Sequence, residues 1–123
     1  MNLKPAGGPI VKERHVRLPK LLKAAHGRSC VRCGVCDETV VFAHYTGLRQ
    51  HALGKGRGVK CHDCCGADLC MECHSYFDQY QGADGSWVKK IELSEEFLFY
   101  CQLTIIRNFQ EGVIETTLGS RYH

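Results

Sequence analysis

Cysteine spacing constrains the fold of this chain more than any other feature of its sequence. Nine cysteines occur in 123 residues, and among those with the spacing Cys-x-x-Cys are Cys30 with Cys33, and Cys70 with Cys73. A disulfide framework is disfavoured because the number is odd, the spacings are short and no N-terminal apolar run resembles an export signal. Two such pairs together supply the four ligands of a tetrahedral structural zinc site. We therefore predict one structural Zn²⁺ bound by these four cysteines.

The first pair has an alternative, because Cys36 lies three residues after Cys33 and repeats the spacing. Gly34 follows Cys33 directly and allows a tight backbone turn there, which favours Cys30 and Cys33. The CHDCC segment offers ligands for a second zinc cluster, but a redox role there is disfavoured because no βαβ pattern surrounds it. The simpler expectation is that Cys64, Cys65 and Cys101 are small buried apolar residues.

Length and composition fit one compact domain. The chain is 44% hydrophobic and 24% charged, and no apolar run approaches the roughly 20 residues of a membrane span. We expect a flexible basic arm over residues 1–16 and a single domain over 17–123, with its core at 28–80. The expected location is cytoplasmic, with no membrane association and no small organic cofactor.

Positive charge is concentrated in two segments, although the formal net charge is only +3. Residues 1–32 carry eight Lys or Arg against a single acidic residue. Residues 49–60 carry four cations, no acid and three glycines, so this segment could follow a phosphate backbone. The alternative is a solvated, flexible surface loop. We predict that its cations bind an anionic partner: Arg49, Lys55, Arg57 and Lys60.

Residue patterns predict regular structure in most of the remaining chain. The predicted elements are a helix over 18–27, a strand over 38–44, a helix that starts near Cys70, a strand over 87–93 and a helix over 94–112. The first strand ends at His44. Ser94 is the predicted N-cap of the last helix, since two glutamates follow it in a favourable first turn.

His74 and Asp78 follow the second cysteine pair on the same predicted helix. Side chains four residues apart on a helix project from the same face, about one turn from each other. An imidazole and a carboxylate at that spacing can chelate one divalent cation and leave coordination positions open for water and substrate. The segment LCMECHSYFD can therefore serve two metals, although a surface hydrogen bond is the simpler use of such a pair.

The order of these features resembles the HNH endonucleases. The segments KAAHGRSC, FAHYTGL, GVKCHD and CMECHSYFD are most similar to the small HNH-type nucleases of lambdoid phages and prophages, and the resemblance covers residues 18–80. It implies an α+β fold with a zinc-stapled treble-clef ββα-metal core, a short N-terminal helix and a longer C-terminal helix.

The resemblance also implies a role for each site residue. His44 would be the general base, and His74 and Asp78 would bind a catalytic Mg²⁺ or Mn²⁺. Asp63 takes roughly the place of the central Asn and is expected to orient a loop or His44. Many family members have a metal ligand directly before the base, where this chain has Ala43. A replacement ligand would have to come from elsewhere, with Asp63, His62 and His51 as candidates.

The function implied by the resemblance is metal-dependent hydrolysis of DNA phosphodiester bonds. A different class of function also fits the sequence: a non-catalytic zinc module that binds DNA or a replication or recombination protein. Both readings predict the same zinc content, and they differ on the role of His44. The oligomeric state and the DNA or RNA preference stay open.

Overall fold

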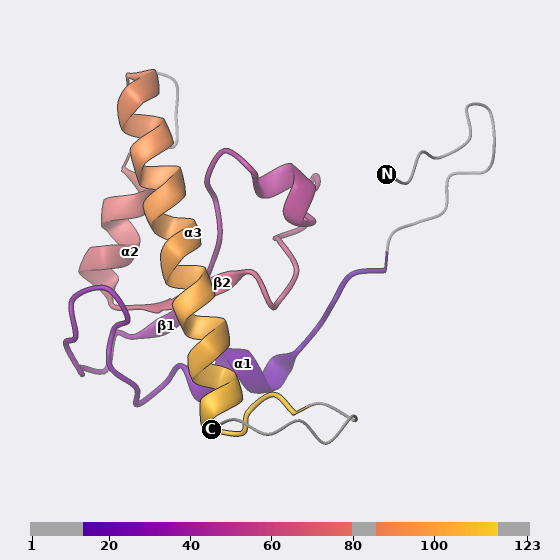
Figure 1. Ribbon diagram of the computed structural model, residues 1–123, viewed down its shortest axis with the longest axis vertical. Coiled ribbons are helices and arrows are strands. Elements are labelled where there is room, and N and C mark those ends of the chain that lie inside the picture. The colour runs from indigo at the N-terminus through magenta and orange to yellow at the C-terminus, as the bar shows by residue number, and fades with distance from the viewer. Residues whose placement is uncertain (1–13, 80–85, 116–123) are drawn as a thin grey trace.

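The computed structural model describes residues 14–79 and 86–115 (Figure 1). The predicted basic arm therefore lies almost entirely outside the described residues. The elements are, in chain order, α1 (Pro19–Ala24), β1 (Val41–His44), the 3-10 helix η1 (Gln50–Leu53), β2 (Gly66–Leu69), α2 (Met71–Asp78) and α3 (Trp87–Gln110). This is a small α+β fold with one two-stranded sheet among its described residues.

The sheet pairs β1 with β2 in antiparallel orientation, with Val41 opposite Leu69 and His44 opposite Gly66. The predicted strand is confirmed in type and in its end at His44, although it begins only at Val41. Gly66 is required at its position, since a Cβ there would lie 2.4 Å from the ring of Phe42. Because Gly66 has no side chain, the Phe42 ring can pack against β2 at the residue opposite His44.

Helix α3 shows that two predictions were wrong. Residues 87–93 form the first turns of this helix rather than a strand, and Ser94 lies buried inside the helix rather than at its start. The N-cap is Ser86, whose hydroxyl accepts a hydrogen bond from the backbone N–H of Lys89 at 3.1 Å. No glycine or proline interrupts residues 87–110, so a helix nucleated at Ser86 continues through the β-favouring residues at its beginning.

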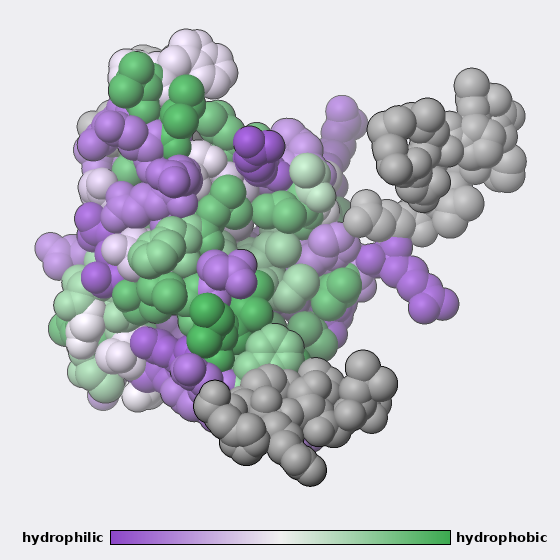
Figure 2. Space-filling view, viewed as in Figure 1, coloured by the Kyte–Doolittle hydropathy of each residue, from purple (hydrophilic) through white to green (hydrophobic). Residues whose placement is uncertain are grey.

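The exposed face of α3 explains why its first turns resemble a strand in sequence. Large apolar side chains lie along this face, and Figure 2 shows apolar surface over the helix. The exposed ones on α3 are Trp87, Val88, Ile91, Phe99 and Ile106. Apolar residues on both faces obscure the 3.6-residue period by which a helix is identified. No helix in the described part of the chain is both long and apolar enough to cross a lipid bilayer.

Helix α3 covers β2 and packs beside α2 (Figure 1). Phe97 of α3 stacks on Phe77 of α2 with ring centroids 4.6 Å apart. At the other end of the helix, the buried carboxylate of Asp68 on β2 accepts hydrogen bonds from Arg107 of α3 at 3.1 Å and from Arg28 at 3.0 Å. The helix is therefore fixed to the sheet through Asp68 and to α2 through Phe77.

Candidate functional site

Four cysteine sulfurs lie together at the junction of the first cysteine segment and α2. The Sγ atoms of Cys30, Cys33, Cys70 and Cys73 all lie within 4.8 Å of one another, and those of Cys33 and Cys70 are 3.7 Å apart. Tetrahedral zinc with Zn–S bonds of about 2.3 Å places its sulfurs about 3.8 Å apart. The cluster could therefore hold a metal ion such as zinc. Cys36 is exposed and lies outside it.

The first cysteine pair is shaped by a tight turn and tied to the sheet. Gly34 adopts a φ of +83°, and its backbone N–H donates to the carbonyl of Cys30 at 2.9 Å. The backbone N–H of Val31 donates to the carbonyl of Asp68 on β2 at 2.8 Å. The second pair needs no separate anchor, because Cys70 follows β2 directly and is the N-cap of α2. Both pairs are therefore positioned by the same end of the sheet.

Hydrogen bonds to sulfur prepare part of the cluster for a cation. Burial alone would raise the pKa of the Cys30 thiol, but backbone N–H groups of Cys33, Cys70 and Arg32 lower that pKa to about 7. Burial raises the pKa of Cys73 to about 12, although a hydrogen bond from Arg32 opposes it. Thiolates are the form that binds a metal, so metal binding at this cluster would release protons.

Arg32 connects the cluster to α3, a role that sequence analysis missed. Its Nη1 donates to the Sγ of Cys73 at 3.3 Å and its Nε donates to Glu96 at 3.0 Å. The guanidinium lies 3.9 Å from the centroid of the Tyr76 ring, and the hydroxyl of Tyr76 donates to Glu96 at 3.2 Å. The signal available in the sequence was an arginine inside the CVRC segment, where a cation can balance thiolate charge.

Replacing Arg32 by methionine is expected to weaken zinc binding by about 10- to 100-fold, the usual effect of removing a hydrogen-bond partner of a metal ligand. Methionine keeps apolar volume beside Tyr76 but cannot donate to the sulfur of Cys73. Competition with a chromophoric chelator measures the affinity. Arg49→Met, which removes an exposed arginine elsewhere, is the matched control. Equal affinity in wild type and Arg32→Met would show that this hydrogen bond does not support the metal.

A cavity of about 240 Å³ brings together residues that the sequence predicts for the site. It is lined by the predicted base, His44, and by the predicted metal ligands, His74 and Asp78. Two of the four predicted nucleic-acid contacts, Lys55 and Lys60, also line it. The rest of its wall is formed by Phe42, Ala43, Tyr45, Thr46 and Cys61. We call this cavity the catalytic pocket, after the roles that the resemblance implies for His44, His74 and Asp78. It joins side chains from β1, from residues 49–60, here called the basic loop, and from α2.

Asp63 lies beneath His44 rather than in the catalytic pocket. Its Oδ1 lies 2.8 Å from Nε2 of His44, and its Oδ2 accepts a hydrogen bond from the backbone N–H of Leu18 at 2.7 Å. Burial alone would raise the pKa of the Asp63 carboxyl, but the hydrogen bonds from His44 and Leu18, together with the charge of Arg17, lower it below its usual value. An ionised carboxylate only accepts hydrogen bonds, so Nε2 of His44 carries the proton.

His74 and Asp78 form a pair within the catalytic pocket. Nε2 of His74 lies 3.5 Å from Oδ2 of Asp78, and their side chains are 39% and 44% exposed. Together they present an imidazole nitrogen and a carboxylate oxygen on the solvent side of the pocket. Among the described residues, only the four cysteines bring three or more candidate ligand atoms within 4.8 Å of one another. A cation at this pair would therefore take its other ligands from water and phosphate.

The residues considered as a replacement for the ligand missing at Ala43 all lie elsewhere. Asp63 is bonded to His44. Nδ1 of His62 accepts a hydrogen bond from the backbone N–H of Val16 at 3.0 Å, and Nδ1 of His51 lies 3.3 Å from the carbonyl of Lys55. None of the three lines the catalytic pocket.

The resemblance of this chain to a known family rests on its own residues alone. No protein-family model, no curated protein and no solved structure matches this chain. The resemblance to the HNH endonucleases therefore stays a prediction from the motifs within residues 18–80.

The basic loop is ordered by its own backbone. Gly54 has a φ of +102° and packs against the ring of His62, where a Cβ would lie 2.8 Å from the ring. Gly56 and Val59 exchange backbone hydrogen bonds at 3.0 and 3.1 Å. The loop carries Lys55 and Lys60 to the catalytic pocket, whereas Arg49 and Arg57 are exposed outside it.

Proposed function

We propose that this protein is a metal-dependent endonuclease of the HNH type, with a zinc-stapled treble-clef ββα-metal core, that hydrolyses DNA phosphodiester bonds. The observation that carries the proposal is the catalytic pocket, which unites His44, His74 and Asp78 with two lysines. These residues come from three segments of the chain, and their combination provides a base, a cation site and phosphate-binding charge. The succession of β1, β2 and α2 with four clustered cysteines supports the proposed core.

His44 is the proposed general base. Asp63 holds the proton on Nε2 and fixes the ring, so the lone pair on Nδ1 is the one available to accept a proton from water. The ring side chain is only 10% exposed, which limits its other rotamers. Asp63 is a positioning residue in this arrangement, because it acts through His44 and does not line the pocket.

His74 and Asp78 would hold the catalytic Mg²⁺ or Mn²⁺. Such a cation would stabilise charge on the phosphate and on the departing 3′ oxygen, and cleavage of that P–O bond would leave 5′-phosphate ends. Lys55 and Lys60 attract and orient the phosphate by charge, and this contribution is sensitive to salt. Asp78 is the only carboxylate among the described residues that line the pocket.

A non-catalytic zinc module that binds DNA, or a replication or recombination protein, is the second candidate. It is favoured by Ala43, which is 2% exposed and contributes only a methyl group where many HNH enzymes have a metal ligand. In that case the lysines of the pocket would bind phosphate without turnover.

Nicking of supercoiled plasmid at low salt tests the proposal. The zinc-loaded protein is expected to nick DNA when Mg²⁺ or Mn²⁺ is added and to stop when the added cation is chelated. His74→Ala is expected to lower the rate at limiting cation by 10-fold or more, with partial recovery at high cation, since one of two ligands is removed. His26→Ala, an exposed histidine away from the pocket, is the matched control. A wild-type protein that retards DNA in a gel but nicks none with any cation would overturn the nuclease proposal and favour the binding module.

A further inference from the structure

A second, larger cavity lies directly beside the catalytic pocket. Its volume is about 540 Å³, and Thr46 lines both cavities. On α2, Phe77 lines the larger cavity and the next residue, Asp78, lines the catalytic pocket. A strand with one phosphate in the catalytic pocket would therefore have a neighbouring nucleotide at the mouth of the larger cavity.

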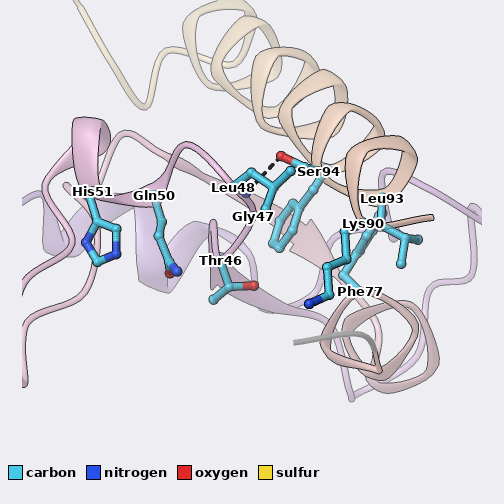
Figure 3. Close-up of a pocket in the computed structure, with 10 residues that line it drawn as sticks. Thr46, Gly47, Leu48, Gln50, His51, Phe77, Lys90, Leu93 and Ser94 are labelled. Carbon is cyan, nitrogen blue, oxygen red and sulfur yellow. Dashed lines mark hydrogen bonds between the residues drawn. The ribbon is translucent and has the colours of Figure 1, made fainter. Parts of the chain in front are cut away.

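The larger cavity has an apolar floor and a polar rim. Phe77, Phe97 and Leu93 lie at the bottom, each no more than 5% exposed, and Leu48, which is 46% exposed, adds apolar surface that a ligand can contact. Thr46, Gln50, His51 and Lys90 provide hydroxyl, amide, imidazole and ammonium groups. Figure 3 shows Thr46 between Gln50 and His51 on one side and Lys90 and Phe77 on the other. The described lining residues include no carboxylate.

This cavity is built before any ligand arrives. The backbone N–H of Leu48 donates to the hydroxyl of Ser94 at 2.9 Å, as drawn in Figure 3. The hydroxyl of Tyr45 is also bonded to that of Ser94, and it accepts a hydrogen bond from the backbone N–H of Arg49 at 3.1 Å. Gly47 allows the loop to cross the Tyr45 ring, since a Cβ there would lie 2.4 Å from its hydroxyl. Ser94, buried in the middle of α3, therefore holds the loop that forms one wall.

We propose that this cavity receives an unpaired nucleobase of the DNA strand whose neighbouring phosphate lies in the catalytic pocket. A base has two flat apolar faces and a polar edge, which matches an apolar floor with donors and acceptors at its rim. The absence of a carboxylate from the described lining, together with the Lys90 ammonium, suits a ligand that carries phosphate. The inference rests on DNA binding by the proposed nuclease.

The expected substrate class is DNA with an unpaired nucleotide. In a duplex each base is stacked and paired, and removing it from the stack costs a few kcal/mol, least where the base is already unpaired. The protein is therefore expected to prefer strands with an unpaired nucleotide beside the phosphate that it contacts. A fully paired duplex would use the catalytic pocket alone.

Fluorescence anisotropy with His44→Ala protein measures this preference without cleavage. Three labelled DNAs of the same length are compared: a fully paired duplex, a duplex with one unpaired nucleotide, and the same duplex with an abasic site in place of that nucleotide. Binding of the unpaired nucleotide is expected to be about tenfold tighter than binding of the other two, as base stacking on a protein surface contributes about 1–3 kcal/mol. Equal affinity for the unpaired and abasic duplexes would overturn the proposal.

Variants of the rim identify the cavity as the origin of the preference. Lys90→Ala and Gln50→Ala are expected to reduce the ratio between unpaired and abasic affinities. Lys89→Ala, the matched control, removes the same charge from the adjacent position on α3, outside the lining, and should keep the ratio. Identical ratios in Lys89→Ala and Lys90→Ala would contradict the assignment.

The two proposals can fail separately. A protein that discriminates unpaired from abasic DNA but cleaves nothing with any cation would keep the base-binding cavity and lose the nuclease. A protein that nicks plasmid but binds all three DNAs equally would keep the nuclease and lose the cavity.

Discussion

Replacing Cys70 by serine is expected to abolish zinc binding and, with it, the cooperative unfolding transition of the chain. Cys70 is one of the four clustered cysteines that could hold zinc, and it also joins β2 to α2. A structural zinc site contributes an apparent binding free energy of about 10–16 kcal/mol, which is as large as the roughly 5–15 kcal/mol of net stability of a typical domain. The four-residue strands of this sheet are too short to replace that contribution.

Zinc content and thermal unfolding followed by circular dichroism measure this effect together. The control is Cys36→Ser, which alters the other candidate ligand but leaves the four clustered sulfurs unchanged. Wild-type metal content and a wild-type transition are expected for this variant. If Cys36→Ser lost zinc and Cys70→Ser kept it, the cluster would not be the metal site.

Replacing His44 by alanine is expected to lower the nicking rate by about 100- to 10,000-fold, the usual contribution of a positioned general base. The variant should still fold and retain zinc, because His44 contributes no ligand to the cysteine cluster. Its loss leaves Asp63 without the Nε2 donor, so a modest decrease in stability should accompany the loss of rate. Rates under single-turnover conditions with added Mg²⁺ or Mn²⁺ provide the measurement.

Two further results would separate a base from a structural histidine at this position. Free imidazole is expected to restore part of the activity of His44→Ala, because it can accept the proton without any covalent attachment. Asp63→Asn is expected to lose less activity than His44→Ala, since it changes the orientation and tautomer of the ring but leaves the ring in place. Full activity in a folded, zinc-containing His44→Ala protein would exclude His44 as the base.

The parts of the fold that could be predicted from sequence are those fixed by local spacing. A Cys-x-x-Cys pair followed by glycine forms its turn from neighbouring residues, so the sequence alone favours Cys30 and Cys33 over Cys36. The end of β1 at His44 was predicted from β-branched and aromatic content. In contrast, β2 has the sequence GADL, without such residues. Its strand conformation arises from pairing with β1 and burial under α3, neither of which is a property of four residues.

The candidate site could likewise be predicted only where local spacing determines it. His74 and Asp78 share a helical face by spacing alone. That Lys55 and Lys60 reach the same pocket, whereas Arg49 and Arg57 do not, depends on the backbone path of the basic loop over many residues. The buried hydroxyl of Ser94 shows the same limit: a serine before two glutamates resembles a helix start, and only tertiary contacts with the loop after β1 explain its place inside α3.

Helix α2 carries Cys73 of the cysteine cluster and, as the next residue, His74 of the catalytic pocket. Each residue of an α-helix advances the chain by about 100° around the axis and 1.5 Å along it. Insertion of a single residue between these two positions would leave the sulfurs in place and rotate His74 and Asp78 by more than a quarter turn away from His44. The angle between the two sites around the axis of α2 is therefore fixed. Insertions and deletions can be accommodated only outside the junction of Cys73 and His74.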